Sequence, residues 1–336
     1  MKLEIFPVTG IGDVSPGDDL AALIAAAAPW LRDGDVLVVT SKIVSKAEGQ
    51  LVDVPAEGPE RAAARDEVLA AESARKVATR GQTRIVQTHH GFVMASAGID
   101  ASNVDRTRLV LLPKDPDASA RALRAALRER HGLDVAVVVS DTMGRPWRNG
   151  LTDVALGAAG IAPVRDHRGE TDPYGNELHI TQMAVIDELA AASELVKGKT
   201  DQVPVAVVRG YLSRPGDDGP GAVTLVREAA SDMFSLGTAE ARAAGLHEAA
   251  LLPLRPPPAG EPADPAAVER AIAAVAGAIA PGTLFTHIPD EGVRATPPQS
   301  SDAAALVRFG TDLHRLRAAL AAEGAGTVPV LPDLPA

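Results

Sequence analysis

The chain has 336 residues, 46% of them hydrophobic and 3% aromatic, and its formal net charge is −11. This length suits two domains or one large domain with an appendage, and the negative charge disfavours general nucleic-acid binding while permitting a local basic pocket for one phosphorylated ligand. The absence of cysteine excludes disulfides, a cysteine nucleophile and thiolate metal sites. The sequence has no apolar run of about 18 residues and no signal-peptide pattern at its start, so we expect a cytoplasmic protein without membrane contact.

Segments rich in Val and Ile, bounded by Gly, Asp or Pro, predict strands in roughly the first 245 residues. These predicted strands are Leu3–Phe6, Val36–Thr40, Ile85–Gln87, Val93–Ala97, Val135–Val139 and Val203–Val208. Apolar residues at helical spacing predict helices between them. These predicted helices are Asp18–Trp30, Glu60–Thr79, Ala118–His131 and Met183–Val196.

Turn-forming residues predict two hairpins, one around His89–Gly91 and one around Asp172–Gly175. Hairpins mixed with helices argue against a purely parallel, doubly wound sheet. We therefore predict that residues 1–245 form an α+β body with mixed sheets.

The composition changes after about Gly245, where prolines become frequent. We predict a Pro-rich linker at 246–265 and a small, mostly helical tail at 266–336. Asp264 as N-cap and Pro265 at the first helical position predict the start of one tail helix, and Ser301–Ala322 is a second, Ala-rich helix.

Polar groups follow three of the predicted strands, where open sheets commonly bind ligands. In Thr40–Lys46, two lysines could neutralise phosphate, or the segment could be a solvated loop. Asp100 and Asp141 each follow a strand, beside hydroxyl and amide groups, and such oxygens are the ligands that Mg²⁺ or Mn²⁺ prefers. The alternative is that both carboxylates only cap helices.

Several other motifs carry less information. Val196–Thr200 suggests a phosphate loop, but Ser193 stands where that motif needs glycine, and the segment ends a helix; a Gly-Lys pair could still hold phosphate. His89 and His90 point to opposite faces of an extended chain, which favours a turn or partly buried role over shared metal binding. The charged stretch Arg165–Asp172 is either a solvated loop or a grip for an anionic substrate. No nucleophile elbow or dinucleotide fingerprint supports a hydrolase or a dehydrogenase.

Taken together, these segments resemble the coenzyme F-420 γ-glutamyl ligase family, over about residues 4 to 242. Order and spacing both agree. The segments that carry the resemblance are Gly34–Gly49, Ala97–Asn103, Ser140–Arg148, Pro204–Gly210 and Asp232–Thr238. The resemblance implies a two-part α+β fold that forms a homodimer, with a nucleotide in the cleft.

The family also implies a reaction. GTP and a divalent cation would drive an amide bond between L-glutamate and the deazaflavin coenzyme F-420-0, followed by γ-glutamyl bonds. The cation would be Mg²⁺ or Mn²⁺, as one ion or two, with K⁺ as a further candidate. An acyl phosphate, attacked by the amine of glutamate, would need positioning and charge neutralisation but no covalent enzyme residue. The number of glutamates added and the choice of GTP over ATP do not follow from any motif.

Carried over residue by residue, the resemblance makes Asp100 and Asp141 catalytic metal ligands, together with Thr142. Archaeal members have a glutamine ligand where this chain has Lys199, and an ammonium group cannot bind a cation, so we assign Lys199 to phosphate. The nucleotide would contact the loop Lys197–Pro204, which includes Lys199. It would also contact Ile11, Gly12, Asp13, Val14, Ser41, Lys46 and Asn103.

The tail departs from the actinobacterial pattern, in which a flavin-reductase domain follows the ligase. The tail here is shorter and has no FMN-binding arginine cluster before it, so we interpret it as a remnant or replacement and expect no FMN. Two alternatives to the ligase remain. One is a paralogous amide ligase for another carboxylate and amine, with specificity in loops such as Arg165–Gly175. The other is a non-catalytic nucleotide-binding homologue.

Overall fold

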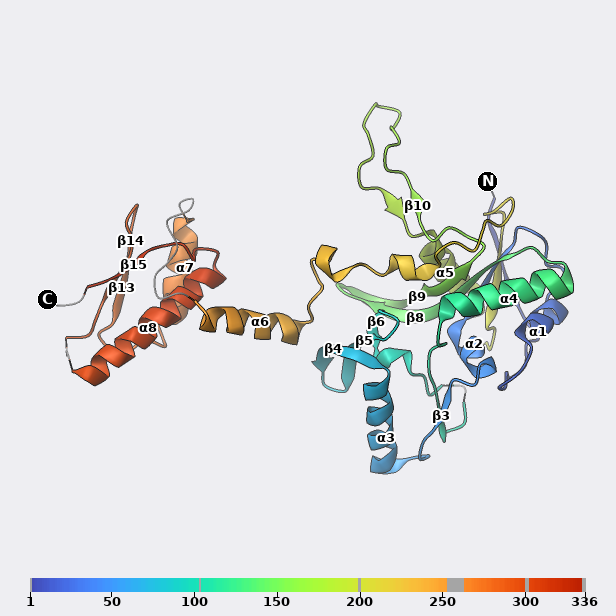
Figure 1. Ribbon diagram of the computed structural model, residues 1–336, viewed down its shortest axis with the longest axis horizontal. Coiled ribbons are helices and arrows are strands. Elements are labelled where there is room, and N and C mark those ends of the chain that lie inside the picture. Colours follow the sequence, from blue (N-terminus) through green and yellow to red (C-terminus); the bar gives the residue numbers. More distant parts are fainter. Residues whose placement is uncertain (1, 103, 199–200, 253–262, 300–301, 334–336) are drawn as a thin grey trace. The chain divides into compact units, whose positions relative to one another are not determined.

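The computed structural model of the protein describes residues 2–102, 104–198, 201–252, 263–299 and 302–333. The chain forms two compact units, residues 1–238 (unit 1) and residues 239–336 (unit 2). Helices and sheets occur in both units (Figure 1), which confirms the predicted α+β class. Of the predicted linker at 246–265, residues 253–262 lie outside the described residues.

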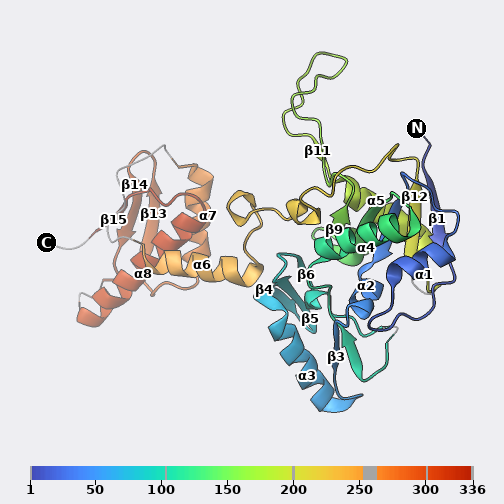
Figure 2. The same ribbon diagram turned by 45° about the vertical axis from the view of Figure 1, so that its right-hand side comes forward.

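Unit 1 is built on a five-stranded sheet with the order β1-β12-β2-β8-β9. These strands are β1 (Glu4–Val8), β2 (Val36–Thr40), β8 (Ala136–Arg145), β9 (Arg148–Ala159) and β12 (Val205–Arg209). Strands β2 and β8 run parallel, whereas the other neighbouring pairs are antiparallel. Figure 2 shows β1 and β12 side by side at one edge. The sheet is therefore mixed, as the sequence predicts.

Helices cover both faces of this sheet. The helices of unit 1 are α1 (Leu20–Ala27), α2 (Ser41–Ala47), α3 (Gly58–Ala71), α4 (Pro116–His131) and α5 (Val185–Lys197). Alternate residues of β2 face opposite sides, so Leu37 and Val39 pack with α1, α2 and α4, whereas Val36 and Val38 pack with α5. Strands covered on both faces explain the continuous Val-rich runs.

Smaller sheets complete unit 1. Their strands are β3 (Leu51–Asp53), β4 (Ser73–Arg80), β5 (Thr83–Thr88), β6 (Val93–Ala95), β7 (Arg108–Val110), β10 (Arg165–Asp166) and β11 (Gln182–Met183). Both predicted hairpins are confirmed: β5 pairs with β6 around His89–Gly91, and β10 pairs with β11. The β10–β11 hairpin stands away from the rest of unit 1 in both views.

Some predicted elements are wrong. The helix expected over Glu60–Thr79 ends at Ala71, and Ser73–Arg80 is strand β4, because pairing with β5 outweighs local helix propensity. The alternative of a solvated loop for Thr40–Lys46 is also wrong, because Ser41–Ala47 is helix α2. Strand β8 continues to Arg145, so Asp141 and Thr142 lie within the strand rather than after it.

Unit 2 contains all but the first residue of α6 (Thr238–Ala250), together with α7 (Pro265–Val275), β13 (Leu284–Ile288), β14 (Gly292–Thr296), α8 (Ala303–Ala322) and β15 (Val330–Pro332). The predicted cap is confirmed, since Asp264 accepts a hydrogen bond from the N–H of Ala266. Helices α7 and α8 pack on a sheet of order β13-β14-β15 around Phe309, Leu316 and Val293. The sequence predicts these two helices and misses the sheet, whose strands are only three to five residues long and are bounded by Pro, Asp and Gly.

The described part of the chain contains no helix with the length and apolar character that a membrane crossing requires.

Candidate active site

Unit 1 contains a cavity of about 490 Å³ beside the end of β2. Its walls come from the loop 11–14, helix α2, strands β8 and β9, the last turn of α5, and residues 202–204. Segments far apart in the sequence therefore meet where polar side chains follow buried strands, as expected for an α/β-type site.

Helix α2 supplies two lysines to this cavity. It begins directly after β2, and Lys42 and Lys46 are four residues apart, so both lie on one face of the helix. The Nζ of Lys42 lies 2.6 Å from Asp100 Oδ2, and the Nζ of Lys46 lies 2.6 Å from Asp13 Oδ1. Each ammonium group is thus already in contact with a carboxylate.

Asp100 is positioned by the short turn Ser96–Gly98. Gly98 has φ +70°, and a Cβ there would lie 2.7 Å from Leu112 Cδ2, so this turn requires glycine. Burial disfavours the charged carboxylate of Asp100, but hydrogen bonds from Lys42 and Ser102 outweigh burial and hold its pKa below the usual range. Asp100 is therefore an anion at neutral pH, next to a lysine that lines the cavity.

Asp141 and Thr142 are neighbours in β8. Asp141 Oδ1 accepts the backbone N–H of Thr142 at 2.8 Å, and Thr142 lines the cavity. The hydroxyl of Thr142 donates to Asp153 Oδ1 at 2.9 Å, and Asp153 stands directly opposite Thr142 in the β8–β9 ladder. Since successive side chains of a strand point to opposite faces, we expect Asp141 and Thr142 to point to different sides of the sheet.

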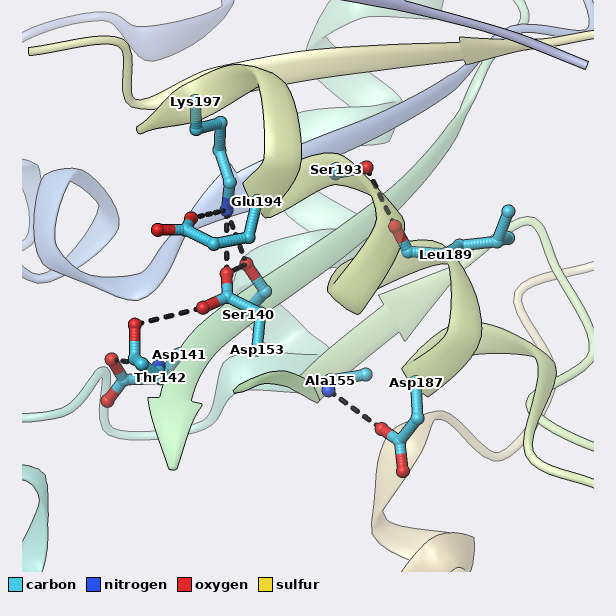
Figure 3. A network of polar contacts seen from close by, with 10 residues as sticks. All are labelled: Ser140, Asp141, Thr142, Asp153, Ala155, Asp187, Leu189, Ser193, Glu194 and Lys197. Atoms are coloured by element: carbon cyan, nitrogen blue, oxygen red, sulfur yellow. Dashed lines mark hydrogen bonds and ion pairs between the residues drawn. The ribbon is translucent and has the colours of Figure 1, made fainter. Parts of the chain in front are cut away.

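A buried ion pair lies behind Thr142 (Figure 3). Lys197 Nζ is 2.7 Å from Asp153 Oδ2, and both side chains are only 3% exposed. Lys197 also donates to Ser140 Oγ at 3.1 Å, and Ser140 donates to Asp153 Oδ2 at 2.9 Å. Glu194 lies 3.4 Å from the same ammonium group. These polar and charged groups contact one another and so hold this part of the cavity wall in place.

The structure brings together most of the sequence-predicted site residues. Those that line the cavity are Ile11, Gly12, Asp13, Val14, Lys46 and Thr142. Ser41 is buried in α2, and Asp100 and Asp141 each lie beside a lining residue. Asn103 and Lys199 lie outside the described residues.

Other candidates fall elsewhere. His89 Nε2 contacts the Ala71 carbonyl at 2.8 Å and His90 Nε2 contacts the Pro113 carbonyl at 3.0 Å, which agrees with the turn and partly buried role. In Arg165–Asp172, the exposed Arg168 pairs with Asp166 in the β10–β11 hairpin.

Sequence reasoning missed Asp153 and did not foresee its pairing with Lys197. The available signal was an acidic residue next to an apolar run in Leu151–Ala159, since a buried carboxylate requires a partner. Lys197 is the last residue of α5, where the helix dipole favours a cation.

Comparisons with known proteins agree with the resemblance seen in the sequence. The family described as F420-0:Gamma-glutamyl ligase matches residues 10–210. The chain is 40% identical over 251 residues to the coenzyme F420:L-glutamate ligase of Methanothermobacter thermautotrophicus, covering 70% of this chain and 99% of that protein. It is 42% identical over 248 residues to the protein of the same name from Methanopyrus kandleri, covering 69% and 97%. The chain therefore belongs to the F420-0:gamma-glutamyl ligase family.

Proposed function

We propose that this protein is a GTP- and divalent-metal-dependent ligase that joins L-glutamate to coenzyme F-420-0 and then adds γ-linked glutamate. One observation carries the proposal: in a member of this ligase family, Lys42 and Lys46 of one helix face meet Thr142 at a single cavity. Its relatives' name supports glutamate and coenzyme F-420 as substrates. A triphosphate and the metal are supported by the charges of the cavity, whereas the guanine base rests on the family resemblance alone.

The charges of the cavity support a nucleotide that binds together with a cation. Its lining contains Lys42, Lys46 and Lys197, and each of these lysines contacts a carboxylate. Their positive charge is thus largely balanced before a ligand binds. A triphosphate would bring several negative charges into this site, and a divalent cation is the usual means of offsetting them.

The oxygen donors at the site fit such a cation. The described residues contain no cluster of three or more His, Cys, Asp or Glu side chains that could hold a metal, so a cage made only of such side chains is not supported there. The carboxylates of Asp100 and Asp141 and the hydroxyl of Thr142 would instead hold the metal, leaving positions for water and phosphate oxygens, as Mg²⁺ and Mn²⁺ prefer. Because Asp141 and Thr142 address different sides of β8, two ions fit better than one.

The chain would act by positioning and by balancing charge. The terminal phosphate of GTP would pass to the acceptor carboxylate, giving an acyl phosphate and GDP. The amine of glutamate would then attack the acyl carbon, and phosphate would leave as the amide bond forms. Lys42 and Lys46 would donate hydrogen bonds to phosphate oxygens in both steps, and the bound cation would supply most of the charge neutralisation.

The proposal is tested by incubating the protein with GTP, Mn²⁺, L-glutamate and coenzyme F-420-0 and measuring product masses. We expect GDP and products heavier by whole glutamate residues, and no product when any component is omitted. Parallel reactions with ATP test the nucleotide, and reactions with glutamine test the amino acid. Absence of product in the complete mixture would contradict the proposal. We also propose a homodimer, which sedimentation equilibrium would test.

A further inference from the structure

The buried pair Asp153–Lys197 has a chemical arrangement that stability alone does not require. Its two side chains are nearly inaccessible to solvent and yet line the cavity. A buried ion pair is commonly no better for stability than well-packed apolar side chains, because desolvation offsets the attraction. A pair placed at a cavity wall is therefore a candidate for a role at the site.

The contacts of Asp153 point to that role. Its Oδ2 accepts hydrogen bonds from Lys197 and Ser140, which fixes the carboxylate plane, and its Oδ1 accepts the hydroxyl proton of Thr142 at 2.9 Å. A hydroxyl that donates to Asp153 has its proton directed at β9, and its oxygen lone pairs point elsewhere. In Figure 3, the dashed lines reach Asp153 from Thr142 at the lower left and from Lys197 above.

We propose that Asp153 and Lys197 are positioning residues that orient the Thr142 hydroxyl so that its oxygen can bind a divalent cation. This inference rests on the proposed metal-dependent function. Partners of a metal ligand commonly set its orientation, and removing them costs about 10- to 100-fold in metal affinity. Both oxygens of Asp153 already accept hydrogen bonds, so we assign it this indirect role rather than direct ligation.

The strand register supports direct coupling between Asp153 and Thr142. The β8–β9 ladder shifts register between Val139 and Ser140, and beyond that shift Thr142 pairs with Asp153. The two side chains therefore share one face of the hairpin as cross-strand neighbours. The effect of changing Asp153 should then pass through Thr142.

The experiment measures Mn²⁺ affinity by electron paramagnetic resonance, in the presence of a non-hydrolysable GTP analogue, in the full-length protein. The key variants are Thr142→Val and the neutralised pair Asp153→Asn with Lys197→Met, which leaves no unpaired buried charge. Asp187→Asn is the matched control: this half-buried acid also contacts β9, through the N–H of Ala155, but not Thr142. Thermal melting shows that each variant is folded.

We expect the neutralised pair to weaken Mn²⁺ binding about 10- to 100-fold, with Asp187→Asn unchanged. Adding Thr142→Val to the neutralised pair should weaken Mn²⁺ binding little more than Thr142→Val does by itself, because the pair acts through the Thr142 hydroxyl. The KM for Mn²⁺ should rise while the KM for glutamate stays within about twofold of the wild-type value.

Two results would overturn this inference and leave the proposed function standing. One is an unchanged Mn²⁺ affinity in the folded neutralised pair. The other is a loss of Mn²⁺ affinity in the pair that simply adds to the loss caused by Thr142→Val. If the wild-type protein neither binds Mn²⁺ nor depends on it, the proposed metal site fails and this inference fails with it. If the neutralised pair does not fold, Ser140→Ala takes its place, because it removes only the hydroxyl that supports the Asp153 carboxylate. We then expect weaker Mn²⁺ binding in Ser140→Ala, and the same two results would contradict the inference.

Discussion

The two units of the chain bury polar side chains for different purposes. In unit 1, Lys46, Asp153 and Lys197 are buried and line the cavity. In unit 2, Asp312 and Thr283 are buried among the described residues, and Asp312 accepts hydrogen bonds from Thr283 and from the backbone N–H of Ala280. Both arrangements satisfy buried groups, and the first also lines the cavity of unit 1. A buried charge is thus evidence of a functional role only when the residues that it contacts line a candidate site.

The largest effect should come from the carboxylates beside the cavity. We expect Asp141→Ala and Asp100→Ala each to lower the rate of glutamate ligation at least about tenfold, because each removes a carboxylate that would hold the cation. Ligation rates at saturating GTP measure this effect, and melting curves check folding. Asp66→Ala, an exposed acid paired with Arg84, is the control. Near-normal turnover in either variant would remove that residue from the site.

A second effect, on the KM for GTP rather than on the rate of ligation, should follow from Lys46→Ala. One charge-assisted contact to phosphate is worth about 1.5–3 kcal/mol, so the KM for GTP should rise by about 10- to 100-fold. The KM for glutamate should change less. Lys2→Ala, which removes an exposed lysine paired with Glu4, is the control. An unchanged GTP dependence would show that Lys46 does not hold the nucleotide, and equal use of ATP would contradict the guanine assignment alone.

In unit 2 we expect a substitution of a buried polar residue to lower stability without lowering the rate of ligation. Asp312→Ala removes the acceptor of hydrogen bonds from Ala280, Thr283 and Arg315, so unit 2 should lose about 1–3 kcal/mol of stability. Ligation should be unchanged. Hydrogen exchange of α7 and α8 measures the stability, and Glu291→Ala at the exposed surface of the same unit is the control. A large loss of ligation would contradict the separation of roles between the units.

Local sequence patterns predicted the parts of the fold that local physics decides. The Val-rich runs of β2 and β8, the turn around His89–Gly91 and the cap at Asp264 each carry their signal within a few residues. The sequence predicts the end of a helix where strand β4 lies, because the pairing partner β5, not the composition of β4, determines its conformation.

The candidate site shows the same limit. The polar segments after β2 and around Asp100 and Asp141 were visible as motifs, and the structure places them around or beside one cavity. The pairing of Asp153 with Lys197 joins residues 44 positions apart, and its burial depends on the β8–β9 register. A single acidic residue beside an apolar run does not specify its partner, so the pattern alone could not reveal this contact.

The smallest effect should appear at Asp187, a half-buried acid of unit 1 that contacts the main chain rather than the cavity. Burial raises its pKa, against the opposing hydrogen bond from the N–H of Ala155. A raised pKa in the folded state means that protonation favours folding. This contribution is complete below the unfolded pKa, near the ordinary value of 3.8, and is lost as pH rises through the folded pKa.

At neutral pH, therefore, wild-type protein carries the cost of a partly desolvated charge that Asp187→Asn lacks, while the amide oxygen can still accept the Ala155 N–H. We expect the variant to be more stable at pH 7 by less than about 1 kcal/mol, since solvent screens part of the charge. The difference should shrink toward pH 4, and ligation should be unchanged. Urea unfolding of unit 1 at both pH values measures this. Lower stability of the variant at neutral pH would mean that the charge of Asp187, favoured at the start of α5, stabilises unit 1 as a helix-terminal carboxylate.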